Sequence, residues 1–165
     1  MRLRRLFRHL LLPHWWVRRA FDRQTLHAIA EAVAGSERRH RGELRFVVEG
    51  LLPLGYLLRE ISARQRAVEL FSQLRVWDTE ENSGILIYVQ LADRRVEILA
   101  DRGIAARVPQ AEWDMICRDM EAAFKRGDYR GGALAAIGKA GELLAEHFPA
   151  ATANPNELPD RPLVL

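Results

Sequence analysis

The sequence predicts an α/β protein: a three-layer α/β/α sandwich with a central mixed sheet and helices on both faces. Two observations support this prediction. A strand, an amphipathic helix and a second strand follow one another between residues 44 and 91, the order of a right-handed βαβ unit with parallel strands. A further apolar segment, 96–100, comes after only four residues, Ala92–Arg95. So short a link permits only an antiparallel hairpin, and the sheet is therefore expected to be mixed.

The composition is that of one globular domain. Of 165 residues, 48% are hydrophobic and 28% are charged, a balance that excludes a disordered chain and allows a core without disulfide or metal staples. The single cysteine, Cys117, cannot form an internal disulfide. We therefore expect a reducing, cytoplasmic environment.

Residues 1–21 are a basic, aromatic N-terminal segment that differs from the rest of the chain. They hold six arginines and no acidic residue, which leaves residues 22–165 with 19 basic against 22 acidic side chains. Pro13 and His14 interrupt the apolar run. A signal peptide needs about 7–15 unbroken apolar residues and a membrane span about 20. The segment therefore predicts neither export nor a spanning helix.

The apolar residues of this segment recur at helical spacing. Leu3, Leu6, Phe7 and Leu10 share one face, and a pair of tryptophans follows. Two interpretations remain open. The helix either packs its leucines on the domain and leaves its arginines in solvent, or it lies on an anionic membrane surface or a membrane protein, peripherally at the inner membrane face. We do not expect a nucleic-acid partner.

The elements of the domain, residues 22–149, follow from periodicity and caps. Residues 23–34 carry a helical apolar stripe, and 44–49 alternate and then run apolar as a strand does. Ser62 is a candidate N-cap for the next helix, and the apolar "ILIYVQL" at 85–91 predicts a strand buried on both faces.

Two helices close the domain, at about 111–126 and 129–148. Small residues that include Gly131 and Gly138 are expected to let the second helix approach a neighbour closely. Residues 150–165 form a proline-rich tail that is expected to be extended or loose.

The hairpin separates two acidic residues. With its turn centred near 93–94, Leu91 would oppose Val96, Asp93 would lie at the tip, and Asp101 would lie at the open end. Eight residues of strand span roughly 25 Å. The two aspartates therefore cannot share a site.

The open end of the hairpin is expected to collect oxygen ligands. The loop that begins at Asp78 enters the sheet there, and Glu43 arrives at the same edge if its strand is parallel to 85–91. We expect Glu43, Asp78, Thr79 and Asp101 to hold a divalent cation, Ca²⁺ or Mg²⁺, because both prefer hard oxygen ligands. The alternative is that these short loops are acidic only because they are solvated.

The five histidines show no zinc-site spacing, and surface or capping roles are expected for them. Only His40, three residues before Glu43, could reach the acidic edge as a general acid or base.

The chain contains, in order, "GELRFVVE", "RAVELFSQLRVWDTEENSGILIYV", "ADRRVEILADRGI" and "EWDMICRDMEAAFKRGDYRGGALAAIGKAGELLAEHFP". Over roughly residues 25–149 this succession resembles the TPM domain family, also called the TPM phosphatase family, and especially its small stand-alone members. The resemblance implies an α/β/α sandwich around a mixed sheet.

The resemblance also implies functions. Some relatives are described as acid phosphatases, some bind Ca²⁺ or other divalent ions, and others are accessory domains of membrane proteins. Glu43, Thr79 and Asp101 match family segments at the predicted edge, whereas Ser83 stands where the family usually has asparagine. We therefore expect a cation site with phosphomonoester hydrolase activity or, alternatively, a non-catalytic interaction domain.

Overall fold

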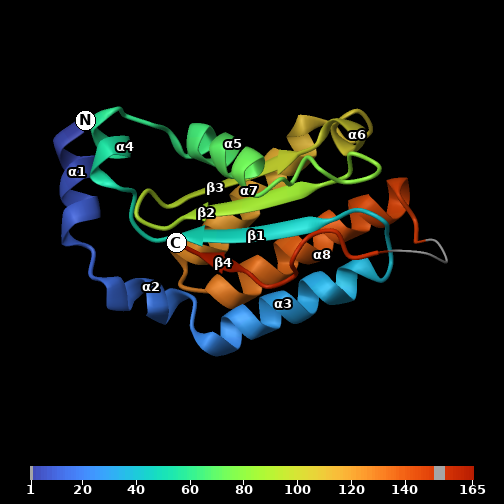
Figure 1. Ribbon diagram of the computed structural model, residues 1–165. Helices are drawn as coiled ribbons and strands as arrows, with labels where there is room; N and C mark the ends of the chain where they lie inside the picture. Colours follow the sequence, from blue (N-terminus) through green and yellow to red (C-terminus); the bar gives the residue numbers. More distant parts are fainter. Residues whose placement is uncertain (1, 151–154) are drawn as a thin grey trace.

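The sheet is mixed, as predicted. The computed structural model describes residues 2–150 and 155–165, apart from the side chains of Arg2, Arg4 and His14. Its strands follow the order β3-β2-β1-β4 (Figure 1), with β1 parallel to both β2 and β4 and with β2 antiparallel to β3. The strands are β1 Leu44–Glu49, β2 Ile85–Gln90, β3 Arg95–Ala100 and β4 Leu163–Val164.

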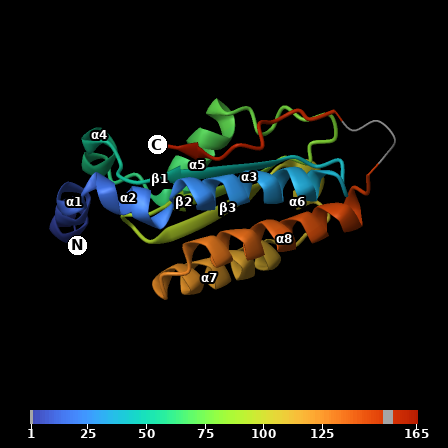
Figure 2. The same ribbon diagram turned by 90° about the horizontal axis from the view of Figure 1, so that it is seen from below.

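Helices cover both faces of the sheet, which confirms the three-layer prediction. One face carries α3 (Arg23–Glu37), α7 (Gln110–Lys125) and α8 (Tyr129–His147), and the other carries α5 (Ala63–Gln73) together with the C-terminal tail (Figure 2). All residues of β1 and β2 are buried. Alternate strand residues enter two apolar cores, one on each face of the sheet.

Four shorter helices complete the chain: α1 Arg2–Leu11, α2 His14–Ala20, α4 Leu54–Leu58 and α6 Arg102–Ala105. The predicted N-cap of α5 is confirmed, because the Ser62 side chain accepts from Gln65 N and the Gln65 side chain accepts from Ser62 N in a capping box.

Helix α3 continues three residues beyond its predicted end at 34, because its last turn packs on α8. A Cβ atom added to Gly141 would lie 1.9 Å from Ser36 Oγ, so the close approach of the two helices depends on this glycine. Neither Gly131 nor Gly138 is buried. A small residue does let α8 approach its neighbour closely, as predicted, but that residue is Gly141 and not Gly131 or Gly138.

The hairpin register differs from the prediction by two residues. Val89, not Leu91, opposes Val96, and the turn is the four residues Leu91–Arg94. A slip of one residue would have moved every side chain to the opposite face, whereas a slip of two keeps the faces unchanged. Asp93 therefore remains in the turn and Asp101 at the open end.

Substitution of Gly84 tests the close packing of the residue before β2 against the backbone of Val76. A Cβ atom there would lie 1.9 Å from the backbone oxygen of Val76. We expect Gly84→Ala to lower the free energy of unfolding by about 1–3 kcal/mol, as overpacking against rigid backbone does. Urea denaturation measures the change. Gly138→Ala is the control, because its added methyl meets no atom within 4 Å and alanine favours a helix by about 0.5–1 kcal/mol. Equal stability of Gly84→Ala and wild type would contradict the packing.

Candidate functional site

The loop before β2 is fastened by backbone contacts to the start of α6. Asp101 N donates to Gly84 O at 2.9 Å, and Gly103 N donates to Asn82 O at 2.9 Å. A Cβ atom on Gly103 would lie 2.4 Å from Glu81 O. Residues 79–84 and 101–103 therefore form one rigid unit, which we call the acidic corner.

Three buried side-chain oxygens of the acidic corner have no hydrogen-bond partner among the described residues: Asp101 Oδ2, Glu81 Oε2 and Ser83 Oγ. The other carboxylate oxygens are engaged, since Asp101 Oδ1 accepts from Arg102 N at 2.7 Å and Glu81 Oε1 pairs with Arg41. Buried polar atoms without partners are uncommon in folded proteins. Their oxygens are of the type that a hard cation would satisfy.

The four predicted ligands do not converge as a set. Thr79 and Asp101 belong to the acidic corner, and Thr79 Oγ1 accepts from Ser83 N at 3.0 Å. Asp78 is exposed, and the Glu43 carboxylate faces the tail, where its Oε2 accepts from Leu158 N at 3.0 Å. Within the described ranges, no group of three or more His, Cys, Asp or Glu side chains is arranged to hold a metal ion. The cation site therefore stays a prediction.

Glu43 instead belongs to a second acidic group with Glu37 and Asp160. Burial, together with the negative charge of Glu43, raises the pKa of Glu37 to about 9, although the carboxylate accepts from Leu44 N at 3.1 Å. Burial likewise raises the pKa of Glu43 to about 7. Glu37 is therefore largely protonated at neutral pH, and Glu43 is divided between its protonated and charged forms.

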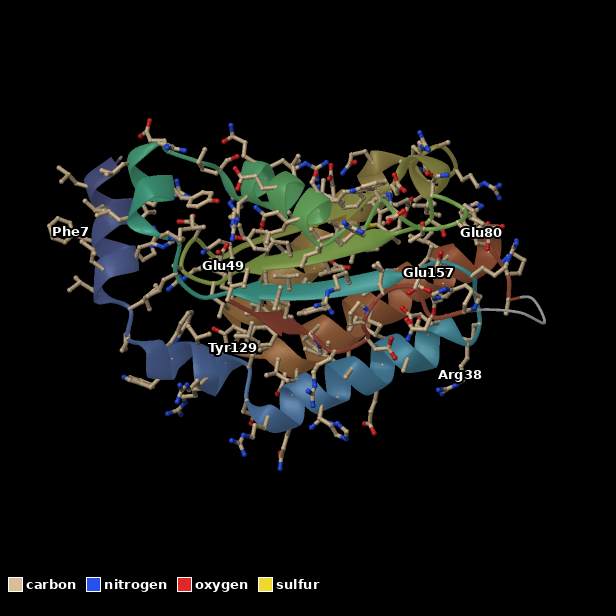
Figure 3. The ribbon with its side chains drawn as sticks, in the orientation of Figure 1. Phe7, Arg38, Glu49, Glu80, Tyr129 and Glu157 are labelled. Carbon is tan, nitrogen blue, oxygen red and sulfur yellow. The ribbon has the colours of Figure 1, made fainter. Side chains whose placement is uncertain are left out.

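The tail links this acidic group to the acidic corner. Glu157 accepts from Glu80 N at 3.1 Å, and both residues lie at the same end of the sheet in Figure 3. Sequence reasoning missed Glu37, Glu157 and Asp160, because α3 was ended too early and the tail was expected to be extended or loose. The apolar run Leu163–Leu165 was the available signal that the tail adds a strand to the sheet.

His40 is not a surface residue. It is fully buried, with Nδ1 2.9 Å from Gly42 O and Nε2 2.8 Å from Ser36 Oγ. Because a carbonyl only accepts, Nδ1 carries the proton and Nε2 accepts from the serine hydroxyl. Burial lowers the pKa of His40 to about 4, so the imidazole is neutral at pH 7. Both ring nitrogens are used in internal hydrogen bonds, and the role of His40 is therefore structural.

Helix α1 docks through its polar side onto the hairpin turn. Arg5 Nη2 lies 2.7 Å from Asp93 Oδ2, and His9 Nε2 lies 3.1 Å from Asp93 Oδ1. His9 Nδ1 accepts from Leu52 N at 3.1 Å, so Nε2 is the protonated nitrogen. Burial alone would raise the pKa of Asp93, but hydrogen bonds from His9 and Arg5 outweigh it and lower the pKa to about 2.

The apolar side of α1 consequently faces outward, and Phe7 projects away from the domain in Figure 3. The interpretation in which α1 packs its leucines on the domain is wrong, because the Asp93 carboxylate recruits Arg5 and His9 instead. Figures 1 and 2 place α4 beside α1. We define the apolar N-terminal face as Leu3, Phe7, Leu10, Leu11, Trp15, Leu54 and Leu58, which are 54–75% exposed. No helix of the described residues is long and apolar enough to cross a membrane.

The buried carboxyl group of Glu37 predicts a pH dependence of stability. Its folded pKa lies above the ordinary 4.5, so its contribution is fully present below about pH 4.5 and is lost as the pH rises toward 9. Glutamine stays neutral and can still accept from Leu44 N. We therefore expect the stability of Glu37→Gln relative to wild type to rise by about 1 kcal/mol or more between pH 5 and 9, measured by urea denaturation. The exposed Glu146→Gln is the control, and a pH-independent difference for Glu37→Gln would count against a buried protonated carboxyl.

Comparison with known proteins identifies the family. The TPM domain model matches residues 18–143, while none of the curated proteins matches the chain. The solution structure of the BA42 protein from the psychrophilic bacterium Bizionia argentinensis is similar, with a TM-score of 0.75 and 30% identity over 86% of this chain and 93% of that one. The N-terminal domain of a protein from P. gingivalis shares the fold, with a TM-score of 0.60 and 20% identity over 79% of this chain and 82% of that one. The chain, with its mixed sheet between two helical layers, belongs to the TPM domain family.

Proposed function

We propose that this TPM-domain protein works at an anionic membrane surface, to which the apolar N-terminal face binds. One observation carries the proposal: α1 uses Arg5 and His9 to hold the domain and leaves its apolar side exposed. A soluble helix normally does the reverse. Large contiguous apolar patches on a protein surface usually mark a partner or a membrane.

The chemistry around this face suits anionic lipid. Arg8, Arg18 and Arg19 are exposed on the same two N-terminal helices, and each basic residue near an anionic membrane contributes about 1 kcal/mol. Trp15 is of the type that settles at the lipid headgroup level. Because the face is carried on helices that are too short to span a bilayer, the attachment would be reversible and dependent on salt.

Co-sedimentation with lipid vesicles tests this function. We expect the wild-type protein to sediment with phosphatidylserine-containing vesicles and less with purely zwitterionic ones. Phe7→Glu should weaken binding at least tenfold, since burying a phenylalanine contributes about 1.5–3 kcal/mol. The domain should remain folded, because Phe7 points away from the docking contacts.

Met115→Glu is the matched control, because it places the same charge on an exposed apolar residue of α7. Wild-type protein that stays in the supernatant with anionic vesicles would refute membrane binding. Equal losses for both variants would show that binding does not use the apolar N-terminal face.

We further propose that the acidic corner binds a divalent cation, with Asp101 and Glu81 as charged ligands and with Ser83 and Thr79 as hydroxyl ligands. The three buried oxygens without partners support this second candidate. Ca²⁺ accepts six to eight oxygens, which include hydroxyls, backbone carbonyls and water, so two carboxylates are sufficient charge. When bound, such a cation can polarise a phosphoryl oxygen, which is the chemistry that phosphomonoester hydrolysis would need.

Isothermal titration with Ca²⁺ and Mg²⁺ tests the cation site. Asp101→Asn should weaken binding at least tenfold, because asparagine still caps α6 but lacks the charge. Asp160→Asn tests the second acidic group, and the exposed Asp119→Asn is a control. Unchanged affinity in Asp101→Asn, or no binding by wild type, would refute the cation site.

An assay with p-nitrophenyl phosphate tests for catalysis. Metal-dependent hydrolysis that is lost in Asp101→Asn would support a phosphatase, whereas binding without hydrolysis would identify a non-catalytic cation-binding domain.

A further inference from the structure

We infer that a cavity beside the hairpin turn binds an organic anion with an apolar body. The cavity has a volume of about 700 Å³ and is lined by residues of α2, the β2–β3 turn, α7 and the start of α8. Small-molecule sites commonly have volumes of about 300–1,000 Å³. This site lies apart from the acidic corner, and the inference does not depend on either proposed function.

The wall of the cavity is aromatic and internally braced. Trp16 meets Tyr129 edge to face at 6.3 Å between ring centroids, and the rings of Phe124 and Tyr129 are 5.1 Å apart. Buried Phe21 packs behind Tyr129 at 5.8 Å. Val89 at the end of β2 adds a branched aliphatic contact. This wall offers a fixed surface to the apolar body of a ligand.

The rim of the cavity is basic. Arg94, Arg95, Arg118 and Lys125 surround it, against the single acid Glu121. Glu121 is already engaged, since its Oε1 accepts from Val96 N at 3.0 Å and lies 3.8 Å from Arg95 Nη1. A net positive rim therefore remains available to a ligand.

Three of these cations form no ion pair with another described residue. The side chains of Arg94, Arg118 and Lys125 are exposed and make no hydrogen bond or ion pair with another residue of the described ranges. Arg94 is fixed at the rim by its backbone, which has φ 55° and donates to Leu91 O at 3.1 Å. An incoming anion could accept from these groups without displacing an existing partner.

Wall and rim together select the ligand class. A neutral apolar molecule would leave the cations without a counterion, and a small hydrophilic anion would leave the aromatic wall unused. A carboxylate or phosphate ester on an apolar body satisfies both. Free amphiphiles and membrane lipids share this chemistry, so the test uses monomeric probes without vesicles.

Calorimetric titration with laurate and dodecyl phosphate, below their micelle concentrations, tests the inference. We expect saturable binding of one molecule per chain, and dodecanol should bind at least tenfold more weakly. Arg118→Gln with Lys125→Gln should weaken laurate binding about tenfold. Arg126→Gln is the matched control, because this exposed neighbour on the same helix end does not line the cavity.

Phe7→Glu separates the cavity from the apolar N-terminal face, and we expect it to bind laurate as wild type does. Since all the substituted residues are exposed, thermal unfolding should show folded variants. The inference is overturned by the absence of saturable laurate binding, by equal affinities of the Arg118/Lys125 double variant and wild type, or by loss of binding in Phe7→Glu.

Discussion

The antiparallel pairing of β2 with β3 sets the positions of the acidic corner and of the carboxylate on which α1 docks. It turns the chain back at Leu91–Arg94, so Asp93 lies at one end of the sheet and Asp101 at the other. At the turn, the Asp93 carboxylate captures Arg5 and His9 and so fixes the orientation of α1. At the open end, the backbone of the hairpin bonds to the loop before β2 and builds the acidic corner. One hairpin therefore organises two surfaces of different chemistry.

The carboxyl ends of β1 and β2, where open α/β sheets commonly bind ligands, are closed by a buried ionic network. Arg66 donates to Glu49 through Nη2 at 2.9 Å and through Nε at 3.1 Å, and Tyr88 donates its hydroxyl proton to Glu49 at 2.6 Å. The Arg66 guanidinium also lies over the ring of Tyr56 at 4.8 Å. With its carboxylate engaged by three donors, Glu49 has no free charge to offer a ligand. The functional candidates therefore lie at the opposite edge of the sheet and, at this end, in the cavity on the other face, beside α7 and α8.

The acidic edge couples protons to the position of the tail. Glu43 accepts from the tail backbone, and Arg45 donates to the carbonyl oxygens of Pro159 and Arg161, both at 2.6 Å. The tail in turn covers Glu37, whose raised pKa reflects burial next to other acids. The position of the tail and the protonation of Glu37 and Glu43 are therefore linked.

The sequence by itself determined what depends on short spacing: the mixed sheet, the antiparallel hairpin, the Ser62 cap and the separation of Asp93 from Asp101. These follow from link length, strand period and local hydrogen bonding. Only the tertiary structure decided the two-residue shift in register, the burial of His40, the meeting of Glu37 with Asp160, and the outward face of α1. Local periodicity defines an amphipathic helix but not which side will find a partner. That choice rested on a carboxylate 88 residues away in the chain from Arg5, a contact that no local pattern encodes.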